Sequence, residues 1–138
     1  MKKSKWLTSI LVLCIAALAL SACGSSSPSV DVSLTSFKIS TSPTSIAAGN
    51  ITFHIKNDAT DVAHDMIIVK TDAAAGSLPT DSTGAVDQTK VTVVGQIQPL
   101  QPGASTDLTV NLAAGHYVLY CSVVGHYASG MDTDFTVN

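Results

Sequence analysis

Three residues near the end of the chain have side chains that bind soft metal ions, and they are equally spaced. Cys121, His126 and Met131 are separated by intervals of five residues. An interval of five turns a side chain by about 140° around an α-helix and reverses its face along a strand, so no regular element brings the three together. A loop could do so, and Gly125 and Gly130 supply the backbone freedom that such a loop needs. We therefore expect these residues in a loop that folds around one point.

The chemistry of these side chains favours copper. Thiolate and thioether sulfur select copper, and imidazole suits it, so a second histidine would complete a trigonal plane of two histidines and one cysteine with a weak axial methionine. That arrangement defines blue-copper electron-transfer sites. His64 is the best candidate, because it directly precedes the apolar run from Met66 to Val69. His54 and His116 alternate with apolar residues in strand-like segments, so we expect both on the surface.

The first residues of the chain have the layout of an export signal. Three lysines precede an apolar run that ends in small residues before Cys23. This segment resembles the bacterial lipobox, which implies a lipoprotein signal peptide at residues 1–22 and a lipid on Cys23. A flexible tether rich in Gly and Ser would follow at residues 23–29. The alternative is an uncleaved transmembrane anchor, which needs about 20 apolar residues, and the run is somewhat shorter.

Both alternatives predict the same location for the rest of the chain. It would be exported and held at the cell membrane, on the periplasmic or cell-surface side. Cys14 would leave with the signal peptide and Cys23 would carry the lipid, so Cys121 would be the one remaining cysteine. A lone thiol outside the cytoplasm is either buried and inert or bound chemically. One cysteine is too few for a binuclear copper centre, and structural zinc sites prefer three or four Cys and His ligands without Met.

Composition limits the remaining possibilities. The chain has 138 residues, of which 46% are hydrophobic and 12% charged, and this balance excludes a disordered tail protein. We expect one domain at residues 30–138. Beyond the signal peptide the chain has four lysines, ten aspartates, and neither arginine nor glutamate. Nucleic acid is therefore excluded as a partner, because its binding needs clustered basic residues.

The elements that must position the site have strand character. Short apolar runs are interrupted by Gly, Pro, Asn and Asp, and their spacing predicts an antiparallel β-sandwich of seven or eight strands. In one segment, Ile51, Phe53 and Ile55 alternate with polar residues, so they should point into the core. The other expected strands lie at 32–39, 66–69, 91–97, 106–112, 117–121 and 133–137. We expect residues 71–90 to form either a long surface loop or a weak helix. We expect Tyr117 to be a core aromatic residue whose hydroxyl bonds locally.

The segment from Gly115 to Met131 resembles the copper loop of the cupredoxins, the plastocyanin and azurin superfamily. The segment His64-Asp65-Met66 and the residues after it are similar to the family's first-ligand segment, and the Cys-x4-His-x4-Met spacing is similar to that of longer-loop members such as rusticyanin and auracyanin. The resemblance implies an all-β, Greek-key cupredoxin sandwich with one type 1 copper ion. It also implies His64, Cys121 and His126 as the strong ligands and Met131 as the axial one.

One position departs from the family's pattern. Many members have asparagine after the first ligand, whereas this chain has Asp65. We expect the Asp65 carboxylate to accept a hydrogen bond from Ser122. Its negative charge would favour the oxidised copper ion.

The resemblance implies an electron carrier rather than an enzyme, acting as a monomer with redox partners such as cytochromes or a terminal oxidase. His126 is flanked by Val124, Tyr127 and Ala128, so we expect an apolar patch where partners dock briefly. The aspartate excess would steer a basic partner. Two alternatives stay open: a copper storage, delivery or sensing lipoprotein that uses the same ligands, and a metal-free binding module.

Overall fold

A computed structural model describes residues 27–138. The expected signal peptide, Cys23 and most of the expected tether lie outside these residues, and Ser29 is already the first residue of a strand. No helix in the described part of the chain is long and apolar enough to cross a membrane.

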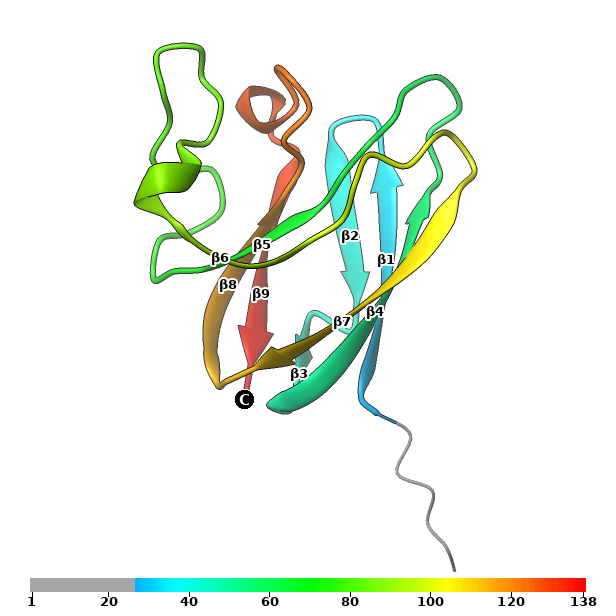
Figure 1. The fold of residues 1–138 in the computed structure, drawn as a ribbon, viewed down its shortest axis with the longest axis vertical. Helices are drawn as coiled ribbons and strands as arrows, with labels where there is room; N and C mark the ends of the chain where they lie inside the picture. The colour runs from blue at the N-terminus through cyan, green and yellow to red at the C-terminus, as the bar shows by residue number, and fades with distance from the viewer. Residues whose placement is uncertain (1–26) are drawn as a thin grey trace, which may run out of the picture.

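Two β-sheets pack against each other, and both are mixed (Figure 1). The first sheet has the order β2-β1-β4-β7 and consists of β1 (Ser29–Thr35), β2 (Lys38–Ser42), β4 (Gly49–Asn57) and β7 (Ser105–Leu112). The second has the order β3-β9-β8-β5-β6 and consists of β3 (Ser45–Ile46), β5 (Ile67–Lys70), β6 (Thr92–Gln96), β8 (Gly115–Tyr120) and β9 (Asp132–Val137). Two short 3-10 helices are η1 (Gln88–Lys90) and η2 (Tyr127–Ser129).

The expected all-β sandwich is confirmed, with two differences. The described residues form nine strands rather than seven or eight. One extra strand arises because the chain reverses within the expected strand at 32–39, which gives β1 and β2. The other is β3, which is only two residues long and was not expected. The sheets are also not purely antiparallel, since β1 runs parallel to β4 and β3 runs parallel to β9. Alternation along one strand does not reveal the direction of its neighbour, so these parallel pairs could not be predicted from it.

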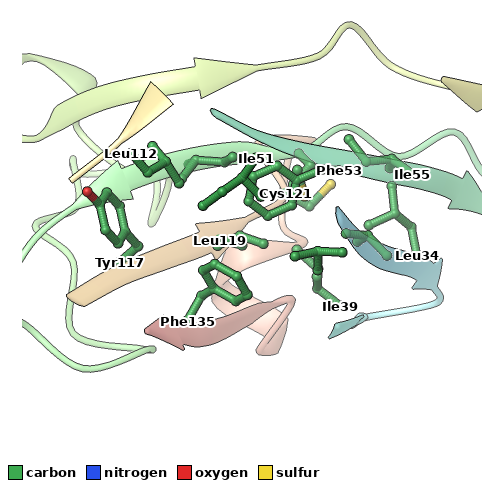
Figure 2. Close-up of a cluster of buried hydrophobic side chains, with 14 of the residues drawn as sticks. Leu34, Ile39, Ile51, Phe53, Ile55, Leu112, Tyr117, Leu119, Cys121 and Phe135 are labelled. Atoms are coloured by element: carbon green, nitrogen blue, oxygen red, sulfur yellow. The ribbon is translucent and has the colours of Figure 1, made fainter. Parts of the chain in front are cut away.

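The core lies between the two sheets. Ile51, Phe53 and Ile55 of β4 are at most 1% exposed, which confirms the alternation predicted for this strand. Figure 2 shows this cluster with Tyr117 at one end and the Cys121 sulfur toward the other. The Tyr117 hydroxyl donates to the Ala113 carbonyl oxygen at 2.7 Å, so Tyr117 is the locally bonded core aromatic that was expected.

A second apolar cluster lies on the outer face of the second sheet. Its buried members are Ile67, Val69, Leu78, Val86, Val118, Tyr120 and Tyr127. Residues 71–91 run over this face as an irregular loop that contains only η1 and one isolated bridge between Thr80 and Val86. Of the two structures expected for this segment, it therefore forms the surface loop and not the weak helix.

Loops gather at one end of the sandwich. The β1–β2 turn and the segments 58–66, 97–104 and 121–131 lie at the top of Figure 1. The first described residues and the C-terminus lie at the bottom. We call the upper end the loop pole, and it contains the candidate residues.

Candidate metal centre

His64, Cys121 and His126 come together at the loop pole. One ligand atom from each lies within 4.8 Å of the others, and all three residues are buried. The two histidine Nδ1 atoms are 3.2 Å apart, and the Cys121 Sγ lies 3.9 Å from His64 Nδ1 and 3.5 Å from His126 Nδ1. Donors bound at about 2.0–2.3 Å to a shared ion are separated by roughly 3–4 Å. The three atoms therefore have the separations of ligands around one metal ion.

The backbone holds His64 against a neighbouring loop. His64 N–H donates to the Leu100 oxygen at 3.1 Å, and Leu100 N–H donates back at 2.7 Å. Asn57, at the end of β4, joins the same two loops through its side chain, which donates to the oxygens of Val62 (2.9 Å) and Leu100 (2.8 Å). Its Oδ1 accepts from Ala59 N–H at 3.0 Å. The backbone that carries the His64 ring is consequently held by bonds that do not depend on a metal.

The loop at 121–131 is closed by its own backbone. Cys121 N–H donates to the Met131 oxygen at 3.1 Å, and Met131 N–H donates to the His126 oxygen at 3.0 Å. Gly125 and Gly130 have φ values of 82° and 88°, in the left-handed region that glycine adopts without strain. The loop expected from the spacing of the three residues is thus present, and Met131 is fully buried at its end.

Burial controls the protonation of these groups. It raises the pKa of the Cys121 thiol to about 12, although the backbone N–H groups of Asp65 and Val123 act in the opposite direction. Burial, followed by the nearby His126, lowers the pKa of His64. A neutral imidazole is the form that binds metals, and a metal ion displaces the proton of a coordinating thiol. The site therefore suits a cation that binds sulfur strongly.

The set of donors fits copper. Two imidazole nitrogens and one sulfur converge, and Met131 supplies a thioether in the loop that also carries Cys121 and His126. Cysteine and methionine sulfur with imidazole is the donor set of a type 1 copper site. In the described residues no other group of three potential ligands is close enough to hold an ion.

Asp65 connects the two ligand-bearing loops. Its Oδ1 accepts from Ser122 N–H at 2.6 Å, and its Oδ2 accepts from the Ser122 hydroxyl. The hydrogen bond expected between Asp65 and Ser122 is therefore present, and it is double. Asp65 is only 6% exposed, so its carboxylate lies largely out of solvent beside the residue that follows Cys121.

The surface around His126 differs from the expected patch. Val124 is 91% exposed, but Tyr127 is buried in the second cluster. The aromatic neighbour is instead Phe37 in the β1–β2 turn, whose ring centroid is 5.4 Å from that of His126 in an edge-on arrangement. Phe37 is 51% exposed and has a φ of 58°. The expected strand through Phe37 is wrong, because phenylalanine favours strands whereas here it occupies a turn.

The two rival histidines are elsewhere. His54 is exposed and its Nδ1 pairs with Asp107 across β4 and β7 at 2.8 Å. His116 is partly buried, with Nδ1 bonded to the Thr71 oxygen and Nε2 to Asp134. Neither belongs to the ligand group.

Comparison with known proteins agrees with this geometry. The profile of the copper binding proteins of the plastocyanin/azurin family matches residues 27–138. Reduced auracyanin from the photosynthetic bacterium Roseiflexus castenholzii is 26% identical, over 82% of this chain and 98% of that one, with a TM-score of 0.61. No curated protein matches the chain in sequence.

Two further solved structures share the fold. Auracyanin A, described as a blue copper protein from Chloroflexus aurantiacus, is 22% identical, over 80% of this chain and 99% of that one, with a TM-score of 0.55. Reduced rusticyanin is 23% identical, over 82% of this chain and 81% of that one, with a TM-score of 0.58.

Proposed function

The chain belongs to the plastocyanin/azurin family of copper-binding proteins, and on that premise we propose that it is an exported, membrane-tethered carrier of single electrons. It binds one type 1 copper ion through His64, Cys121 and His126, with Met131 as the axial ligand. The observation that carries the proposal is the convergence of the two Nδ1 atoms and the Cys121 sulfur on one point.

A bound copper ion would supply a one-electron Cu(II)/Cu(I) couple, which takes one electron from a reduced donor and passes it to an oxidised acceptor. The protein would keep the ligands in place during both steps. The backbone bonds at His64 and the closed loop at 121–131 support this role, because neither needs the ion to form. Little rearrangement would then accompany the change of charge.

Burial favours a carrier over an enzyme. His64, Cys121 and Met131 have no exposed surface, and His126 is 8% exposed, so a substrate would have no route to the ion. An electron needs no such route. His126 is the most exposed of the four proposed ligands, and its ring lies next to Phe37. We assign docking of cytochromes or a terminal oxidase to this face, together with the exposed Val124 of the same loop.

The arrangement of the described chain suits a tether. The strand that follows the expected tether starts at the end of the sandwich opposite the loop pole (Figure 1). A lipid on Cys23 would therefore attach the molecule by one end and leave the loop pole directed away from the membrane. Changing Cys23→Ser should move the protein from the membrane fraction to the soluble fraction, and continued membrane association of this variant would contradict the tether.

The visible spectrum of the copper-loaded protein tests the central proposal. An intense thiolate-to-copper band should appear with one copper per chain and should vanish in Cys121→Ala. His54→Ala is the matched control, because it removes an exposed histidine and should leave the band unchanged. A colourless copper-loaded protein would overturn the proposal.

Copper delivery or storage through the same ligands is separated from electron transfer by the rate of metal release. A carrier should retain its ion against a Cu(I) chelator and give reversible voltammetry. Rapid loss of copper to the chelator would support delivery instead.

A further inference from the structure

We propose that residues 71–91, called here the strap, position the copper-binding loop at 121–131 from outside the sandwich, with Tyr127 as the positioning residue. The inference rests on the proposed function, because that loop carries three of the four proposed ligands. In Figure 1 the strap stands beside the loop at the upper left of the molecule.

The contact at Tyr127 joins the strap directly to the ligand loop. The Tyr127 hydroxyl accepts a hydrogen bond from Leu78 N–H at 2.9 Å, and this bond is buried. Tyr127 follows His126 immediately and is the first residue of η2. Its ring also packs edge-on against Tyr120, at 5.7 Å between centroids. The side chain next to a proposed ligand is thus fixed by one polar and one aromatic contact, both outside the sandwich core.

Apolar packing supports the same contact. Leu78 and Val86 of the strap are 4% and 8% exposed, and they belong to the cluster that contains Tyr120 and Tyr127. Gly84 of the strap also faces η2, because a methyl group added at this position would lie 3.7 Å from the Ala128 Cβ. The strap therefore covers the outer side of the loop, where the core cannot reach.

The two strap residues at 75 and 76, shortly before Leu78, are anchored to β9, the strand that begins directly after Met131. Asp134 accepts a hydrogen bond from Ala75 N–H at 2.7 Å, and Asp132 accepts one from Gly76 N–H. The strap thus contacts the loop through Tyr127 and the strand that leaves the loop through two carboxylates. A displacement of the 126–131 segment would have to break contacts on both sides.

Tyr127→Phe tests this role, because it removes one hydroxyl and leaves Leu78 N–H buried without a partner. In the metal-free full chain, amide hydrogen exchange at Gly130 and Met131 should become about tenfold faster, since loss of a buried hydrogen bond frees this local unit to open. These two N–H groups donate to the Tyr127 and His126 oxygens, so they report on the loop itself.

Tyr117→Phe is the matched control. It also removes a hydroxyl from a buried tyrosine, but its partner is the Ala113 oxygen in the turn between β7 and β8. Exchange at Gly130 and Met131 should stay unchanged in this variant. Equal acceleration in both variants, or none in Tyr127→Phe, would overturn the inference.

The copper-loaded chain gives a second measurement. Residues that orient metal ligands change metal affinity about 10–100-fold when they are mutated, so Tyr127→Phe should release copper to a chelator at least about tenfold faster than Tyr117→Phe. Asp134→Ala removes the strap's bond at Ala75 N–H, together with the His116 contact, and changes no residue of the loop, so it should act in the same direction. If Tyr127→Phe and Asp134→Ala both released copper at the wild-type rate, the strap's role would be contradicted. If the wild-type chain bound no copper, the proposed function would fail, whereas the exchange measurement would still decide the inference.

Discussion

The Asp65 carboxylate is the residue that most distinguishes the chemistry of this site. It lies next to His64 in sequence, is largely buried, and accepts two hydrogen bonds from Ser122, which follows Cys121. A fixed negative charge beside the ligands stabilises Cu(II) more than Cu(I), so it lowers the reduction potential.

Replacing this charge should therefore raise the reduction potential. A unit charge within about 10 Å at an effective dielectric of about 20 contributes roughly 1.7 kcal/mol, or about 70 mV for one electron. Asp65→Asn keeps an oxygen acceptor for Ser122, so the potential should rise by about this amount with copper retained. Voltammetry measures the change, and Asp31→Asn, at an exposed position on β1, is the control that should shift the potential far less. A lower potential in Asp65→Asn would refute the electrostatic argument.

The identity of the ligands could be predicted from the sequence, because it depends on residue type and spacing. Cys121, His126 and Met131 share one loop, and its two glycines are visible in the sequence. The roles of Asn57 and Tyr127 were not predictable. Their partners are the Leu100 oxygen and Leu78 N–H, which lie 43 and 49 residues away. Any residue type can supply a backbone partner, so the sequence does not reveal hydrogen bonds to backbone groups at such separations.

At the scale of elements, alternation predicted β4 and its buried face, whereas pairing between strands depended on contacts that one segment does not encode. The end of β4 illustrates the difference. Asn57 occupies an inward position in the alternation and is fully buried. A buried amide is tolerated because its three hydrogen bonds serve the loops that hold His64.

Asn57→Ala should destabilise the metal-free protein by about 3 kcal/mol, because it leaves the Val62 carbonyl and the Ala59 N–H without partners and removes one of the two hydrogen bonds at the Leu100 carbonyl. Denaturant unfolding measures this loss. Asn50→Ala removes an exposed amide of the same strand that bonds only to Asn111, and it should change stability by less than about 0.5 kcal/mol. Similar losses in the two variants would show that Asn57 does not organise the loops.

The pair between β4 and β7 should give the first sheet a pH dependence. The hydrogen bond that Asp107 accepts from the His54 ring, with smaller charge effects from Asp107 and Asp31, raises the pKa of His54 above 6.5. Because the folded-state pKa is raised, the stabilisation is complete below pH 6.5 and is lost as the pH rises through the raised value. An NMR titration of the His54 ring should show the raised pKa, and Asp107→Asn should return it toward 6.5. An unchanged pKa in Asp107→Asn would exclude this pair as the cause.

The whole molecule has a directional arrangement. The described chain starts at one end of the sandwich, and the ligand loops, Phe37 and Val124 lie at the other (Figure 1). A small apolar face favours brief encounters rather than a stable complex. The exposed loop-pole residue Asp61 adds negative charge close enough to His64 to act on its ring. Apolar contact would then set the final docking, while charge would set the rate of encounter.

Electron transfer to a basic cytochrome should accordingly slow as salt increases. Beyond residue 22 the chain has ten aspartates against four lysines, and attraction between exposed charges is screened within about 10 Å at roughly 0.1 M salt. Stopped-flow measurements should show a fall of about tenfold in the second-order rate constant between roughly 0.01 M and 0.5 M salt. Asp61→Asn should reduce this dependence more than Asp31→Asn, because Asp31 lies near the start of β1, at the end of the sandwich opposite the loop pole. A neutral reductant should show almost no dependence. A rate to the basic partner that rises with salt would mean that repulsion governs the encounter, and the docking face would then lie in a region of positive charge.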